Sequence, residues 1–206
     1  MTWKDITIEK YDKIAGLKTE GLGEIDLIAQ TIAILDGTTV EEVEKIPYAV
    51  LLLKARGLRF LQSNPIPSIV HKSYELGGKK YITTLKPEDI TTAQYIDFQV
   101  RAADNPEDLA GLLSVFLIPE GHKYNEGYSS EDVRNVIYKE MSIEDAMGVS
   151  AFFFALWKKS IHRLLRQTKR QYRQLRRKRN QTETEKELLL TMEKLIKTIS
   201  EVLKLS

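Results

Sequence analysis

Apolar residues at helical spacing run through the first third of the chain. Stripes with spacings of three and four cover residues 8–17 and 25–35, each followed by a glycine break. A capping-box pattern at its start predicts a short helix over 39–46, and a proline in the first turn suits a further helix over 47–62. These patterns predict an N-terminal group of helices over residues 1–65.

The middle of the chain carries the only clear strand pattern. Two segments, 68–75 and 79–84, flank a turn that contains Gly77 and Gly78. Paired glycines between two strand-like segments are typical of a tight hairpin turn. We therefore expect a β-hairpin within residues 66–86.

Helical patterns return after the hairpin and define a central core over residues 87–160. One helix follows Thr91 and places Ala93, Ile96 and Val100 at spacings of three and four. A short, very apolar helix is predicted over 109–117, and further helices over 130–140 and from residue 143 onward. A loop of polar and aromatic residues, 122–128, separates the second of these helices from the third.

The C-terminal part, residues 161–206, is predicted to be a basic helix followed by a last helix. Ser142 and Asp145 form a capping-box pattern that begins the longest helix, from Ile143 to about Lys178. The last helix, 183–203, has apolar residues at alternating spacings of four and three, which is the seam of a coiled coil. Its expected helix-helix contacts are Leu188, Met192, Leu195, Ile199 and Val202. Such a seam needs a partner, and the preceding long helix is the nearest one, so we predict an antiparallel helical hairpin.

The fold class expected from these elements is mainly α. It is a multi-helix domain with one small β-hairpin and a C-terminal antiparallel helical hairpin. We expect one compact domain with a helical extension, because 206 residues suffice for a core and an appendage.

Charge is distributed very unevenly along this pattern. The window 146–182 contains no Asp or Glu but eleven Lys or Arg, while the rest of the chain has 20 basic and 29 acidic residues. The sequence therefore predicts an acidic body with one strongly basic helix, and this asymmetry indicates what the protein can contact.

On a helix, the arginines of this window form a single stripe at spacings of three and four: Arg163, Arg166, Arg170, Arg173 and Arg177. A second stripe on nearly the opposite face consists of Ile161, Leu165, Thr168, Tyr172 and Leu175. Three interpretations of the arginine stripe stay open: a solvated face, contact with nucleic-acid phosphates, or binding to an acidic protein, including the acidic body of another copy. Binding to a membrane surface is not expected, because the apolar side suits a helix better.

The chain lacks the patterns of known catalytic sites, and we expect no enzyme activity and no cofactor. It has no cysteine, and His71, His122 and His162 fall in three different predicted elements, so no metal site is expected. The N-terminus has no secretory pattern, and no apolar run approaches the length of a membrane span.

A longer pattern in the central region resembles a family. Its parts are ELGGKKYI at 75–82, LKPEDITTAQYIDF at 85–98, LAGLLSVFLIP at 109–119, Tyr128, MSIEDA at 141–146 and FFF at 152–154. It resembles small structural and assembly proteins of tailed bacteriophages, especially crAss-like gut phages, and is similar in pattern to tail assembly chaperones.

The resemblance implies a non-enzymatic structural component of the virion, in the tail or head–tail region. It would act as a homo-oligomer among other phage structural proteins, with the basic helix facing DNA or an acidic neighbour. Two alternatives remain: a tail assembly chaperone that acts in the host cytoplasm and is absent from the mature particle, and a nucleic-acid-binding adaptor.

Overall fold

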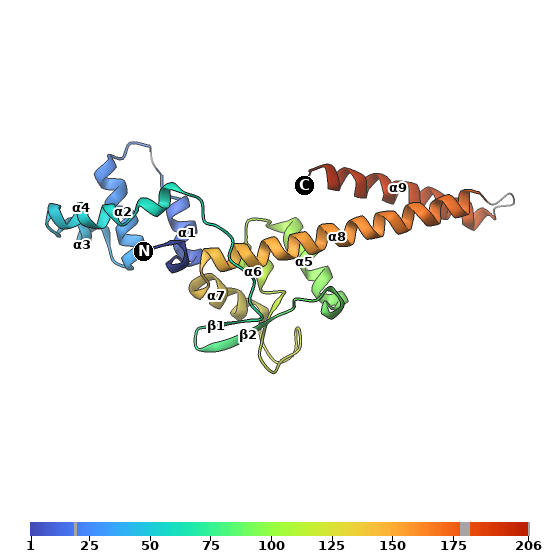
Figure 1. The fold of residues 1–206 in the computed structure, drawn as a ribbon, viewed down its shortest axis with the longest axis horizontal. Coiled ribbons are helices and arrows are strands. Elements are labelled where there is room, and N and C mark those ends of the chain that lie inside the picture. The colour runs from blue at the N-terminus through green and yellow to red at the C-terminus, as the bar shows by residue number, and fades with distance from the viewer. Residues whose placement is uncertain (19, 178–181, 206) are drawn as a thin grey trace. The chain divides into compact units, whose positions relative to one another are not determined.

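The computed structural model describes residues 1–18, 20–177 and 182–205, and it is mainly helical with a small antiparallel sheet (Figure 1). The α-helices are α1 (Ile8–Ala15), α2 (Glu24–Asp36), α3 (Val40–Glu44), α4 (Tyr48–Arg56), α5 (Thr92–Asp104), α6 (Leu109–Leu113), α7 (Ser130–Glu140), α8 (Ile143–Arg176) and α9 (Glu183–Leu205). The strands are β1 (Ser73–Leu76), β2 (Lys79–Thr83) and β3 (Leu117–Pro119), and 3-10 turns η1 (Trp3–Asp5), η2 (Arg59–Gln62) and η3 (Pro87–Asp89) complete the order. The predicted fold class is confirmed.

The chain divides into two compact units between Ala151 and Phe152. The first unit holds every element from η1 to α7 and the beginning of α8, and the second holds the rest of α8 and all of α9. The sequence suggested a change nine residues later, at 160–161.

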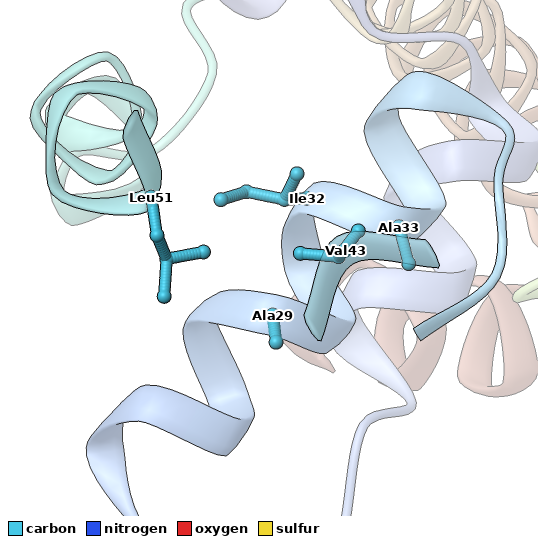
Figure 2. Close-up of a cluster of buried hydrophobic side chains, with 5 residues drawn as sticks. All are labelled: Ala29, Ile32, Ala33, Val43 and Leu51. Carbon is cyan, nitrogen blue, oxygen red and sulfur yellow. The ribbon is translucent and has the colours of Figure 1, made fainter. Parts of the chain in front are cut away.

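The first part of unit 1 is a small helical cluster built around α2. Helices α3 and α4 pack against α2 through five buried side chains, which Figure 2 shows: Ala29, Ile32, Ala33, Val43 and Leu51. Thr39 caps α3 with its hydroxyl, as the capping-box pattern predicted. The helix predicted over 47–62 is interrupted, because α4 ends at Arg56 and a separate 3-10 turn, η2, follows.

The sheet confirms the predicted hairpin and adds a strand to it. Strands β1 and β2 pair with Tyr74 opposite Tyr81, and Gly77 and Gly78 both adopt positive φ, as a type I′ turn requires. Strand β3 pairs with the other edge of β2 in the order β1-β2-β3.

Strand β3 corrects one prediction. The apolar segment 109–117 was predicted to be a single helix, but α6 ends at Leu113 and Leu117 begins β3. Leu117 is fully buried and pairs with Thr83. A short apolar run does not distinguish a helix from a buried strand, and here the open edge of β2 decides between them.

The two ends of unit 1 are joined by backbone hydrogen bonds. The amide of Ile8 donates to the carbonyl of Met141, and the amide of Ile143 donates to the carbonyl of Ile6. All four side chains are at most 2% exposed. The N-terminal segment is therefore part of the core that holds the start of α8.

Unit 2 is a helical hairpin, in which α9 runs back along α8 (Figure 1). Thr168 and Met192 are both buried. Thr168 lies eight residues before the end of α8, and Met192 lies nine residues after the start of α9, so the two lie at a similar height along the hairpin. The prediction of an antiparallel helical hairpin is confirmed.

Candidate functional site

The start of α8 is held firmly in unit 1. Ser142 caps the helix by accepting a hydrogen bond from the amide of Asp145, and the Asp145 carboxylate accepts one from the Ser68 hydroxyl at 2.6 Å. A Cβ atom on Gly148 would lie 2.4 Å from the Ser68 carbonyl oxygen, so the close approach of the 68 segment requires a glycine here. The glycine in this helix is thus a packing requirement.

Beyond unit 1, α8 has two distinct faces. Leu165 and Thr168 are buried, and Tyr172 and Leu175 are half-buried. The arginines on the other side are exposed: Arg166, Arg170 and Arg173 in the helix, and Arg177 directly after its end. The predicted division into a covered stripe and an arginine stripe is confirmed for these residues. The side chains of Ile161 and Arg163 lie outside the described part. We call Arg166, Arg170, Arg173 and Arg177 the arginine face.

Helix α9 covers a different stripe from the predicted one. Leu188 is 47% exposed, while Leu189 and Ile196 are half-buried and Met192 is buried. The burial of Met192 agrees with its predicted place in the seam and the exposure of Leu188 does not, while the helix-helix contacts themselves stay a prediction. The side chains of Leu195, Ile199 and Val202 lie outside the described part. Leucines occupy 188, 189 and 190 in a row, so the apolar pattern leaves the rotation of the helix open by about 100° per residue.

The arginine face belongs to a unit of opposite charge to the rest of the chain. Unit 1 has 16 basic and 24 acidic residues, a difference of −8, whereas unit 2 has 15 basic and 5 acidic residues, a difference of +10. Guanidinium groups bind phosphates and carboxylates with two parallel hydrogen bonds. The arginine face can therefore bind polyanions or acidic protein surfaces.

The polar groups of unit 1 make structural contacts. Asp108 caps α6 by accepting from the amide of Gly111, and it pairs with Arg134 at 2.7 Å. Burial and the nearby Asp108 carboxylate raise the pKa of Asp12 above its usual value. Asp108 thus binds the helix end and an arginine at once, which is a structural role for a carboxylate.

The two histidines whose side chains the structure describes, His71 and His122, make separate local contacts. The His71 ring packs edge-on against Tyr74, and His122 Nδ1 lies 3.2 Å from the Glu126 carbonyl oxygen; the side chain of His162 lies outside the described part. Among the residues that the structure describes, no three His, Asp or Glu side chains are close enough together to hold a metal ion.

The predicted loop 122–128 is tied to α5. Tyr124 donates a hydrogen bond to the Asp97 carboxylate at 2.6 Å, and burial together with this bond raises the pKa of Tyr124 well above its usual value. Tyr128 and His122 line a cavity of about 510 Å³ beside β2 and α7. The loop therefore supports unit 1 through its tyrosines.

A second surface was not identified from the sequence. The apolar stripe of α5 that contains Ile96 and Val100 is exposed, at 53% and 60%, while Gln94 on the other side is buried. Apolar spacing located this stripe but does not tell which way it faces. The capping box between Thr91 and Gln94 was the available signal, because it ties Gln94 to the first turn of the helix.

No protein-family model matches this chain, and neither does any curated protein or solved structure with which it was compared. Of the helices that the structure describes, none combines the length and the apolar character needed to cross a bilayer.

Proposed function

We propose that this chain is a non-enzymatic structural component of a tailed-phage particle, in the tail or head–tail region, and that its arginine face binds a negatively charged neighbour. The observation that carries the binding proposal is the exposure of Arg166, Arg170 and Arg173 opposite the buried Leu165 and Thr168. Because the helix is covered on one side, the arginines project together from the other. An ordered face of this kind suits a repeated contact better than a disordered basic tail does.

The placement in a phage particle rests on the resemblance of the central pattern. That pattern includes LKPEDITTAQYIDF at 85–98 and LAGLLSVFLIP at 109–119. The alternative from the same resemblance is a tail assembly chaperone, which acts during assembly and is absent from the finished particle. The basic hairpin favours the structural role, because it supplies a permanent binding face outside the resembling region.

Mass spectrometry of purified particles tests the cellular role directly. A structural component is recovered from particles in constant proportion to the major tail or head–tail proteins after repeated density-gradient purification. A chaperone is found in the infected-cell lysate but not in the particles. A soluble monomer that never purifies with particles contradicts the proposal.

Replacement of Arg166, Arg170 and Arg173 by Gln tests the binding face. If the face binds DNA phosphates, three lost contacts reduce the slope of log affinity against log salt by roughly 3. If the partner is instead an acidic protein, it too binds the variant less tightly. In that case double-stranded DNA has little affinity even for the unchanged chain at moderate salt. The matched control replaces Lys4, Lys45 and Lys123, three exposed lysines of unit 1, by Gln. Unchanged binding to both kinds of partner would contradict a role for the arginine face.

A further inference from the structure

Helix α5 lies on unit 1 with much of its apolar surface exposed. Its exposed side carries Tyr95, Ile96 and Val100, which are 45%, 53% and 60% exposed, together with Ala93. Its inner side carries Gln94, which is 1% exposed, and Phe98, which is 5% exposed and packs against Phe116. A surface helix of a globular protein ordinarily turns its apolar stripe toward the core, so this orientation needs a physical cause.

Hydrogen bonds of the inner side, together with the buried ring of Phe98, supply that cause. The Gln94 amide donates to the buried carbonyl of Val115 at 2.9 Å, and its oxygen accepts from the amide of Thr91. About two turns further along, Arg101 donates to the carbonyl of Gly111. A rotation of α5 that buried Ile96 would remove these bonds and take the Gln94 donor away from the buried Val115 carbonyl, which costs about 1–3 kcal/mol. The apolar stripe is therefore held outward.

Acidic residues lie at both ends of the exposed stripe. Glu88 and Asp89 precede α5 in η3, and Asp104 and Glu107 follow Val100; all four are exposed. The one basic residue of α5, Arg101, donates its hydrogen bonds to Gly111 and Ser130 of unit 1. This stripe is apolar, has acidic ends and lies on a unit with a net charge of −8. It is therefore complementary to a surface that is both basic and amphipathic.

We propose that this surface binds the arginine face of a second copy of the chain. The inference rests on the proposed function in one respect, that the arginine face binds an acidic partner. The aliphatic stems of arginines cover apolar surface while their guanidinium groups remain hydrated or paired, so they can lie over Ile96 and Val100 and reach the acidic ends. Both surfaces extend over twelve residues, Ala93 to Asp104 and Arg166 to Arg177, or about 16 Å from end to end at helical rise.

A second copy of the chain already carries the basic charge that the acidic surface of α5 requires in a partner. Unit 2 carries +10 against −8 for unit 1, so each copy has one basic face to give and one acidic face to accept. Such a contact joins different surfaces of the two copies and generates a ring or an open chain of subunits. Attraction between the oppositely charged units weakens as salt screens it.

Two variants of the full chain test the contact. The acceptor variant replaces Ile96 and Val100 by Lys, and the donor variant replaces Arg170, Arg173 and Arg177 by Glu. The control replaces the exposed Lys4, Lys45 and Lys123 by Glu, which changes the net charge as much as the donor variant does. Molar mass is measured by analytical ultracentrifugation at about 50 mM and about 500 mM salt, and circular dichroism verifies that each variant retains its helix content.

The expected result is complementation. The unchanged chain and the control form oligomers at low salt and dissociate at high salt, while each variant alone is monomeric. An equimolar mixture of the two variants forms a heterodimer, because the donor variant retains an intact α5 surface and the acceptor variant an intact arginine face. If either substitution prevents folding, milder variants replace it. The acceptor variant then carries Gln at Ile96 and Val100, and the donor variant carries Gln at the same three arginines. Each of these variants alone should associate more weakly than the unchanged chain.

Several results would overturn the inference. Oligomers of the donor variant alone would mean that α5 pairs with α5, and a monomer at every salt concentration would mean that no second copy binds. Loss of double-stranded DNA binding in the donor variant, with self-association unchanged, would identify DNA as the occupant of the arginine face. The proposed function fails separately: a monomeric chain that is still recovered from particles overturns only the self-contact.

Discussion

Helices α5 and α8 carry equally regular apolar stripes, yet one stripe is exposed and the other is covered. In α5, Ile96 and Val100 face outward and Gln94 is buried, whereas in α8, Leu165 and Thr168 are buried and Arg170 is exposed. The difference lies in the polar side. Gln94 of α5 is short enough to bond to the Val115 carbonyl inside unit 1, beside the buried Phe98, while arginines with long charged side chains remain at the surface. Apolar spacing locates a stripe, and the bonding of the opposite side decides where it faces.

The largest expected effect is on the buried polar side of α5. Gln94→Ala removes the donor to Val115 and the acceptor for Thr91, and it leaves a cavity. We expect a loss of about 3 kcal/mol in the free energy of unfolding, because the Val115 carbonyl is buried. Urea denaturation followed by circular dichroism measures it. The matched change Ile96→Ala, on the exposed side, should cost at most about 0.5 kcal/mol; equal losses would contradict the outward orientation of Ile96.

A smaller effect is expected in the hairpin, where the covered stripe is apolar. Met192→Ala should lower the free energy of unfolding by about 2 kcal/mol, since Met192 is buried. Leu188→Ala is the matched control and should change it by about 0.5 kcal/mol or less, because Leu188 is 47% exposed. Hydrogen exchange of α9 peptides reports the local loss. If Leu188→Ala proves the more damaging change, α9 is rotated toward the seam predicted from sequence.

The smallest effect concerns the bond between the 122–128 loop and α5. Tyr124→Phe removes the hydrogen bond to Asp97 and should cost about 1 kcal/mol at neutral pH. The pKa of Tyr124 is raised in the folded chain, so its contribution is complete below the unfolded pKa of about 10 and is lost as pH rises toward the folded value. Denaturation at pH 8 to 11 should show a steeper loss for the unchanged chain than for Tyr124→Phe. Parallel curves would mean that Tyr124 is not buried against Asp97.

Much of the fold could be predicted because its local signals are strong. Gly77 and Gly78 indicate the hairpin turn, Ser142 and Asp145 indicate the start of α8, and the stripe that contains Leu165 and Thr168 indicates its covered face. These features depend on residues close together in the chain. The structure bears each of them out.

The remaining features depend on distant partners. Leu117 belongs to β3 because the edge of β2, more than thirty residues earlier, is open to it. Gln94 is buried because Val115 offers a carbonyl. Three adjacent leucines leave the rotation of α9 open in the sequence, where spacing alone favoured Leu188, and packing in the hairpin with α8 decides it. In each case the deciding group lies outside the window in which periodicity is read.

The hydrogen bonds between residues 6–8 and 141–143 also set an order of events during synthesis. Unit 1 cannot complete its fold until Ile143 has left the ribosome, because residues 6–8 need that segment as their hydrogen-bond partner. Contacts over so long a stretch form slowly, and domains generally fold as units during translation. The arginines follow Ile143 by some twenty residues or more. The acidic half of the molecule can thus begin to assemble before its own basic half is available to interfere with it.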